Sequence, residues 1–195
     1  MIDELQVKPL TKSSWNDLLT LFGKTGGNSQ CWCLAWRLRG KELANIPYQE
    51  RMIKLKTLSE QNLYPLGLLG YLNNNPVTWV GCSPKESFYK LSHSRVIKPI
   101  DDKKVWSIVC FYFHKEYRGK KLIYPMIQGI IDYAKVEKIP IIESYPVELN
   151  EGDRMNDTPI WHGTKAIFES LGFEKVGETS ATSGGKPRVI MRYYT

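Results

Sequence analysis

A short basic loop, residues 118–121, separates a run of apolar residues from a long amphipathic stretch. The start of a helix carries unpaired backbone N–H groups and a partial positive charge, so a loop that leads into a helix is a natural anion site. Arg118, Lys120 and Lys121 add three cations, and Gly119 lets the backbone approach a ligand closely. These residue types at this spacing predict a site for phosphate. A loop of this kind can also be a plain connection between a strand and a helix.

The elements on either side of the loop are the clearest in the sequence. Nearly every residue of 105–113 is apolar or aromatic, which predicts a central strand buried on both faces. In residues 122–134 the apolar side chains form one wide helical stripe, and Pro125 falls in the first turn, where its missing N–H costs nothing. Residues 139–145 are typical of another strand. A strand, a helix and a strand in this order predict a parallel pair with a right-handed crossover.

Shorter elements surround this unit. We expect a strand at 5–8, a helix from Ser13 or Ser14 to Gly23, and a hairpin of residues 66–72 and 76–82. A helix at 47–59 would bury Met52, Ile53, Leu55 and Leu58, and shorter helices are expected near 86–91 and at 163–171. A final hairpin would join residues 173–179 to 188–194. The order of elements indicates a mixed α/β, or α+β, fold.

Two segments resemble those of the GNAT (GCN5-related) N-acetyltransferases. Residues 111–123 (FYFHKEYRGKKLI) are similar to the family's coenzyme-A-binding strand, loop and helix, and 168–177 (FESLGFEKVG) to its closing helix and strand. The resemblance spans about 66–194. Within the family it is closest to a little-characterised bacterial group with a Cys-Trp-Cys segment, here 31–33, and a Glu-x-Tyr-Pro strand end, here 143–146.

The resemblance implies a single domain over 1–195 with helices on both faces of a twisted, mostly antiparallel sheet. One parallel strand pair would splay at the acyl-CoA site. Residues 1–65 would form a helical acceptor-side region and 66–195 the acyl-CoA-binding core. The cofactor residues implied are Phe111, Tyr112, Phe113, Arg118, Gly119, Lys120, Lys121, Leu122, Ile123 and Phe168, and the acceptor residues are Trp32, Trp36 and Arg37.

The family's chemistry is the attack of an amine on the thioester of acetyl-CoA, which acts as a co-substrate without a metal. The transfer needs a base, a stabilised oxyanion and a proton for the leaving thiolate. Many relatives have a tyrosine where this chain has Phe168, so we name Glu143, Tyr145 and His162 as catalytic candidates. Glu143 and Tyr145 share a strand face by two-residue alternation. A salt bridge for Glu143, and structural hydrogen bonds for the other two, are the alternatives.

Two positions of the loop depart from the family pattern. Lys121 replaces a glycine, and Ile123 replaces a glycine or alanine. If the backbone at Lys121 requires a positive φ, lysine costs about 1 kcal/mol or more relative to glycine. The loop has then either lost tight cofactor binding or gained a cation beside the pyrophosphate. We favour retained binding.

The four cysteines do not form a familiar metal pattern. Cys31 and Cys33 are one residue apart, whereas structural zinc sites pair cysteines two to four residues apart, and Cys82 and Cys110 lie in predicted strands. Buried free thiols are the simplest interpretation. Four cysteines in a chain of this length, with no apolar run long enough to span a bilayer, favour a reducing cytoplasm.

The charge leaves two other functions open. The net charge of +7 suits a polyanionic partner, although the cations are scattered, which makes nucleic acid a weaker expectation than a phosphate-rich cofactor. A non-catalytic acyl-CoA sensor is the first alternative to an acetyltransferase, and a nucleic-acid-associated protein is the second. The sequence does not identify the acceptor, which we expect to be a small amine or a peptide. It leaves open whether the chain forms a homodimer.

Overall fold

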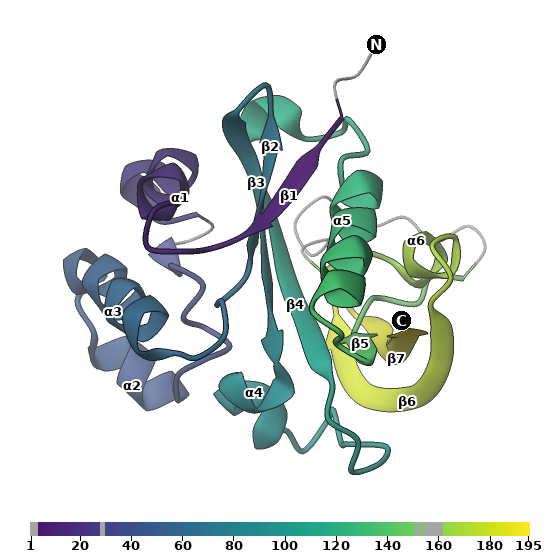
Figure 1. Ribbon diagram of the computed structural model, residues 1–195. Coiled ribbons are helices and arrows are strands. Elements are labelled where there is room, and N and C mark those ends of the chain that lie inside the picture. Colours follow the sequence, from purple (N-terminus) through teal and green to yellow (C-terminus); the bar gives the residue numbers. More distant parts are fainter. Residues whose placement is uncertain (1–3, 28–29, 151–152, 154–161) are drawn as a thin grey trace.

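A seven-stranded sheet is the centre of the computed structural model, which describes residues 4–27, 30–150, 153 and 162–195 (Figure 1). The strand order is β1-β2-β3-β4-β5-β7-β6, and every pairing is antiparallel except that of β4 with β5. This confirms the predicted fold class and the parallel pair. The strands are β1 (Gln6–Pro9), β2 (Leu68–Leu72), β3 (Asn75–Pro84), β4 (Trp106–Phe113), β5 (Ile141–Ser144), β6 (Glu174–Ser183) and β7 (Lys186–Tyr194).

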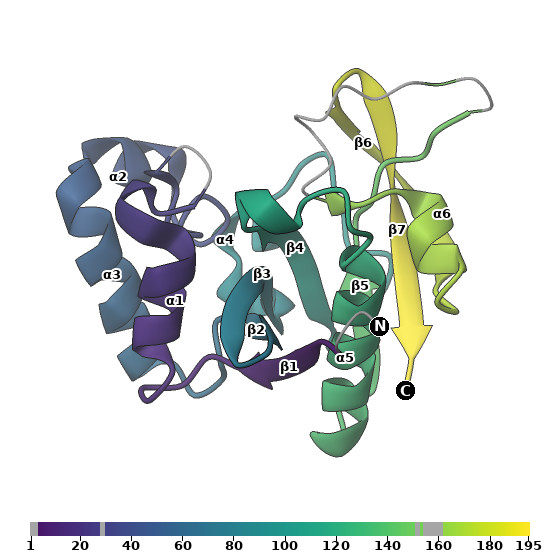
Figure 2. The same cartoon turned by 90° about the horizontal axis from the view of Figure 1, so that it is seen from above.

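Helices cover the two faces of the sheet. Figure 2 shows α1, α2 and α3 on one side of β1 to β4, with α5 on the other side and α6 beside β7. The α-helices are α1 (Trp15–Phe22), α2 (Gly40–Asn45), α3 (Tyr48–Gln61), α4 (Tyr89–Ser92), α5 (Ile123–Val136) and α6 (Lys165–Glu169). Short 3₁₀ turns are η1 (Gly23–Thr25), η3 (Lys85–Ser87) and η4 (Lys115–Tyr117).

The long helix α5 holds the sheet through its apolar stripe. Its buried side chains join those of β3, β4 and β5 in one core cluster, as the sequence periodicity predicts. At Gly129 the helix passes so close to β1 that a Cβ atom would overlap Val7. The close approach fixes α5 across the sheet, and its first turn is thereby fixed near the end of β4.

Most predicted elements are confirmed, with boundaries shifted by a few residues. Asn73 and Asn74 both have positive φ in the turn between β2 and β3, as expected of residues that tolerate this conformation. The expectation that Ile53 is buried is wrong, since this side chain is 58% exposed while Leu55 is fully buried. Only one side of α3 packs on the protein, and Arg51 fills part of that side. The short helix α2 was not predicted.

Candidate functional site

Strands β4 and β5 pair over three residues only. Trp106, Ser107 and Ile108 of β4 lie opposite residues 142–144, after which β5 ends while β4 continues to Phe113. The register of β4 against β3 shifts at the same level, where Val109 is an extra residue in β4. A bulge of this kind bends a strand and re-aims its groups. The edge of β4 beyond Ile108 is therefore free of β5.

Backbone donors point toward this open edge. The N–H of His114 donates to the Val77 carbonyl oxygen at 2.9 Å, which fixes the alternation of hydrogen bonds between β3 and β4. Tyr112 then directs its N–H toward β3, and Phe111 and Phe113 direct theirs away from it. The side chain of Arg118 reaches back to the Phe113 carbonyl oxygen at 3.2 Å and links the basic loop to this edge.

The backbone of the basic loop has a positive φ at Lys121, the position where the GNAT pattern has a glycine. Gly119 has φ of 74° and Lys121 has φ of 57°, so a lysine occupies a left-handed position at a cost of about 1 kcal/mol. Arg118, Lys120 and Lys121 are all exposed, and no atom lies within 4 Å of where a Gly119 Cβ would be. The loop thus places exposed cations and accessible backbone next to the first turn of α5. The N–H groups of that turn have no partners within the helix.

Glu143 is fully buried in an ionic network. One carboxylate oxygen accepts hydrogen bonds from Lys85 Nζ at 2.7 Å and from the Tyr145 hydroxyl at 2.6 Å, and the other accepts from Arg192 Nε at 2.8 Å. Arg192 also forms a bidentate pair with Asp101 and lowers the pKa of that carboxyl to about 2. The salt bridge considered from the sequence is present. It uses both oxygens of the carboxylate.

Tyr145 ties the two parallel strands together where they begin to separate. Its hydroxyl lies 2.9 Å from Ser107 Oγ, and Ser107 is the residue of β4 that lies opposite Glu143. Burial, and then the charge of Glu143, raise the pKa of Tyr145 well above its ordinary value. Glu143 and Tyr145 do share one face, as predicted. Their hydrogen bonds fix the point from which the strands diverge.

His162, Trp36 and Arg188 meet beside the bulge of β4. His162 Nδ1 lies 2.9 Å from the Val109 carbonyl oxygen, and the His162 ring stands edge-on to Trp36 with centroids 5.8 Å apart. Because a carbonyl only accepts, Nδ1 carries the hydrogen and Nε2 keeps its lone pair. Burial first, and then the positive charge of Arg188, lower the pKa of His162 to about 3. The ring is neutral at physiological pH.

Arg188 is a buried cation with an incompletely used guanidinium. Its Nε donates to the Tyr145 carbonyl oxygen at 2.7 Å and its guanidinium lies 5.7 Å from the centre of the Trp36 ring. Within the part of the chain that the structure describes, buried Nη2 has no hydrogen-bond partner. A buried donor left unpaired is costly, so this atom is able to donate to an acceptor that comes within reach.

The remaining predicted site residues lie in the core around this region. Trp32 is buried edge-on against Phe22, and Arg37 donates from its two terminal nitrogens to the carbonyl oxygens of Leu66 and Ser87. Phe168 is fully buried beside Phe111 on the α5 side of the sheet. Trp36 is partly exposed, so of the proposed acceptor residues it combines solvent access with proximity to His162.

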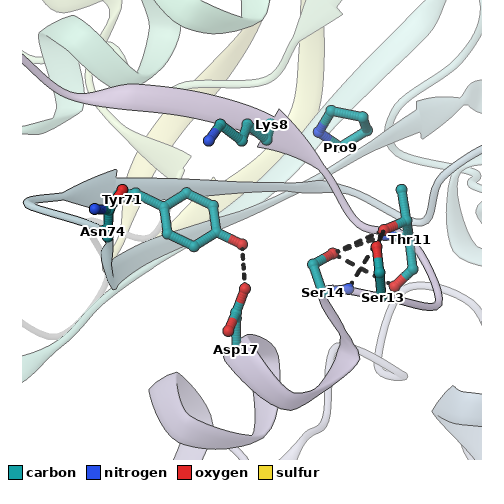
Figure 3. A pocket seen from close by; sticks show the side chains of 8 residues that line it. All are labelled: Lys8, Pro9, Thr11, Ser13, Ser14, Asp17, Tyr71 and Asn74. Atoms are coloured by element: carbon teal, nitrogen blue, oxygen red, sulfur yellow. Dashed lines mark hydrogen bonds between the residues drawn. The ribbon is translucent and has the colours of Figure 1, made fainter.

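A separate polar pocket of about 480 Å³ lies at the far edge of the sheet (Figure 3). The Tyr71 hydroxyl donates to Asp17 across it at 2.8 Å, and Lys8 lies over the Tyr71 ring. The pocket is built on β1, α1 and β2, whereas the splayed edge belongs to β4. It therefore plays no part in the site described above.

Comparisons with solved structures identify the fold. The chain is similar over its whole length to an uncharacterised protein (BH2621) from Bacillus halodurans, with a TM-score of 0.59, 18% identity and 88% of that chain covered. It is similar to AAC(6')-Ib in complex with paromomycin and acetyl-CoA (TM-score 0.56, 15% identity, covering 98% of this chain and 94% of that one). A GNAT-family acetyltransferase from Streptococcus agalactiae gives a TM-score of 0.53 at 10% identity, covering 100% and 98%.

The chain has the GNAT fold. At these identities the likeness is one of fold, and it agrees with the resemblance of residues 111–123 and 168–177 noted in the sequence. No known family model matches the sequence, and no curated protein matches it. The described helices include none long and apolar enough to cross a membrane.

Four residues of the site were not predicted. They are Lys85 in η3, directly after β3, Ser107 in β4, and Arg188 and Arg192 in β7. The pairing of strands distant in the sequence brings these elements beside residues 143–145. Two basic residues four positions apart in a strand, with only apolar residues between them, as at 188 and 192 of β7, are the sequence feature that could have identified two of the four.

Proposed function

We propose that the protein transfers the acetyl group of acetyl-CoA to an amine. The observation that carries this proposal is the parallel pair β4–β5, which separates after Ile108 while β4 continues toward an exposed basic loop at the start of α5. In this arrangement the pyrophosphate would lie on the loop, and the pantetheine arm would run along the open edge of β4. We also propose that the chain is one domain, with the acceptor entering from the side formed by residues 1–65.

Backbone N–H groups of β4 would bind the pantetheine arm and the acyl carbonyl. Phe111 and Phe113 direct their N–H groups to the open edge, where β5 offers no competing acceptor. A donor held in place before the reaction stabilises the oxyanion that forms when the amine attacks the thioester carbonyl. As the C–S bond breaks, the thiolate of CoA leaves and takes up a proton.

The acceptor amine would lie among His162, Trp36 and Arg188. The neutral ring of His162 presents Nε2 as a hydrogen-bond acceptor for the amine. Nη2 of Arg188, which has no partner among the described residues, would donate to an oxygen of the acceptor. With a pKa of about 3, His162 is a weak base. We therefore propose that it orients an amine that arrives unprotonated, so that catalysis depends on positioning.

Tyr145 is the proposed proton donor to the leaving thiolate, and Glu143 is a positioning residue. The Tyr145 hydroxyl lies at the divergence of the strands with Ser107 on one side and Glu143 on the other. Both oxygens of Glu143 already accept hydrogen bonds, from Lys85, Arg192 and Tyr145. Glu143 would therefore affect the reaction by holding the Tyr145 hydroxyl in place. We propose cytoplasmic acetyl transfer without a metal.

A non-catalytic acyl-CoA sensor is the second candidate function. Two observations favour it, namely the left-handed backbone at Lys121 and the phenylalanine at position 168, which lacks a hydroxyl. Nucleic-acid binding would show a steep salt dependence. The sensor predicts that acetyl-CoA binds without release of free thiol, whereas a nucleic-acid-associated protein predicts binding to nucleic acid.

The test combines calorimetry with an assay of thiol release. We expect acetyl-CoA to bind, and free CoA thiol to appear when a panel of amines and peptides is added. Arg118→Met should weaken binding by roughly 10- to 100-fold, because a hydrogen bond to a charged group contributes about 1.5–3 kcal/mol. Lys135→Met, at the other end of α5, is the matched control and should bind as the parent does. Absence of binding by the parent protein would refute the proposal, and binding without turnover across the panel would favour the sensor.

A further inference from the structure

Two thiols that are distant in the sequence meet on the acceptor side of β4. The Sγ atoms of Cys33 and Cys110 are 3.8 Å apart, although the residues are 77 positions apart in the chain. Cys33 lies in the segment between η1 and α2, and Cys110 lies in β4 between the bulge residue Val109 and Phe111. Cys33 is 5% exposed and Cys110 is partly exposed.

The neighbouring strand leaves the space in which the two sulfurs meet. Gly81 of β3 pairs with Cys110, and a Cβ atom at Gly81 would lie 3.1 Å from Cys33 Sγ and 3.5 Å from Cys110 Sγ. Such an atom would crowd Cys33 Sγ and also Val109 Cγ2, which would lie 3.0 Å away, and it would be in ordinary contact with Cys110 Sγ. The glycine therefore permits the thiol pair.

Two buried N–H donors next to Cys33 lack ordinary partners. Among the described residues, Arg37 Nε and Trp79 Nε1 are buried without a hydrogen-bond partner. Hydrogen bonding from Cys110, the charge of Arg37 and contacts from Trp79 and Arg37 outweigh burial and lower the pKa of Cys33 to about 6. A thiolate on Cys33 would meet the needs of both donors.

The other cysteines have the opposite tendency. The hydrogen bond to Cys33, and then burial, raise the pKa of Cys110 well above its ordinary value. Burial raises the pKa of Cys82 to about 12, and burial followed by the charge of Cys33 raises that of Cys31. The pair therefore combines one nucleophilic thiolate with one neighbouring thiol, while burial keeps Cys82 protonated and unreactive.

We propose that Cys33 and Cys110 are a site of reversible oxidation, at which a hydroperoxide converts the two thiols into a disulfide. The Cys33 thiolate attacks one peroxide oxygen, the O–O bond breaks, and hydroxide leaves and is protonated to water. The Cys110 thiol then attacks the sulfenic sulfur, the S–O bond breaks, and a second water leaves with the thiol proton. The protein loses two hydrogens, and one molecule of hydrogen peroxide is reduced to two of water.

The disulfide would alter the strand that is proposed to bind acetyl-CoA. Its formation shortens the S–S separation from 3.8 Å to about 2.0 Å, so the Cys33 segment or β4 must shift. Cys110 lies between the bulge and the N–H of Phe111, and a shift there would displace the proposed oxyanion donor. We expect oxidation to lower acetyl transfer several-fold and a dithiol reductant to restore it. This effect, unlike the disulfide, rests on the proposed function.

Peptide mapping of the oxidised full-length protein tests the proposal. The reduced protein is treated with hydrogen peroxide, free thiols are blocked, and it is digested without reductant. We expect one cross-linked peptide pair joining Cys33 to Cys110, lighter by two hydrogens, which a reductant separates. A link between Cys31 and Cys33, or no link at all, would overturn the proposal. The unmodified sequence is used here, so the result is independent of the folding of any variant and of acetyl transfer.

Variants and alkylation kinetics give an independent readout. Cys33→Ser should abolish the cross-link, and Cys31→Ser, the matched control in the same segment, should retain it. The rate of Cys33 alkylation should rise with pH through a midpoint near 6, well below the ordinary value of about 8.5. A midpoint at 8 or above would contradict the thiolate. Gly81→Ala should slow cross-linking, and cross-linking at the parent rate would contradict the geometry.

Discussion

Replacing Glu143 by glutamine should destabilise the protein strongly, because it removes a buried charge that two cations share. Glu143 is 0% exposed and its two oxygens bind Lys85 at 2.7 Å and Arg192 at 2.8 Å. Removing one partner of a buried ion pair costs about 3–5 kcal/mol, because the remaining charge is left without compensation. Arg192 keeps its pair with Asp101, and the glutamine oxygen can accept one bond. We therefore expect a loss of about 2–4 kcal/mol in the free energy of unfolding.

Urea unfolding at neutral pH measures this loss, and Glu148→Gln is the matched control. Glu148 also pairs with two lysines, Lys165 and Lys175, but its side chain is 23% exposed, so its loss should cost about 0–1 kcal/mol. A free energy of unfolding for Glu143→Gln within about 1 kcal/mol of the parent value would refute the argument that these charges are buried from water and depend on one another for compensation. A Glu143→Gln protein no less stable than Glu148→Gln would refute it equally.

Three further predictions concern the loop and the acceptor side. Lys121→Gly should raise the free energy of unfolding by about 0.5–1 kcal/mol. Glycine relieves the strain of the left-handed backbone, and the larger conformational freedom of glycine in the unfolded chain offsets part of this gain. A lower stability in urea unfolding would contradict the φ of 57°. The folded pKa of His162, about 3, lies below its unfolded value of about 6.5, so its contribution to stability is complete above pH 6.5 and declines as pH falls toward 3. NMR should accordingly show no titration of the His162 ring above pH 5, and a midpoint near 6.5 would contradict the burial of this ring. Arg188→Met should raise KM for the acceptor by about tenfold with little change in KM for acetyl-CoA, since a bond from a charged donor contributes about 1.5–3 kcal/mol; equal changes in both would contradict its place on the acceptor side.

The features predicted well from the sequence are those with a strong local pattern. The apolar run before the basic loop and the stripe after it determine β4 and α5, and the strand that follows determines the parallel pair. The doubt over Lys121 also follows from local sequence, because a missing glycine marks a strained position. Each of these conclusions depends on residues in the single stretch from β4 to β5, 106–144.

The features that were missed depend on strand register and on distant pairing. Nothing near Cys33 in the sequence points to Cys110, and the two meet in the fold next to Gly81, whose missing side chain leaves room beside Cys33. Arg192 reaches Glu143 because the two residues pair directly between β5 and β7. The prediction that Ile53 is buried is wrong for a local reason. A helical pattern identifies an apolar stripe but does not show which part of the stripe contacts the core.

A crystal structure of the protein with acetyl-CoA tests the central claim most directly. We predict the pyrophosphate on the backbone of residues 118–123, the pantetheine arm along β4, and the thioester oxygen within hydrogen-bond distance of the Phe111 N–H. The methyl end of the acetyl group should face His162 and Trp36. Acetyl-CoA bound elsewhere, for example in the pocket beside Tyr71 and Asp17, or no binding at saturating concentration, would contradict the account.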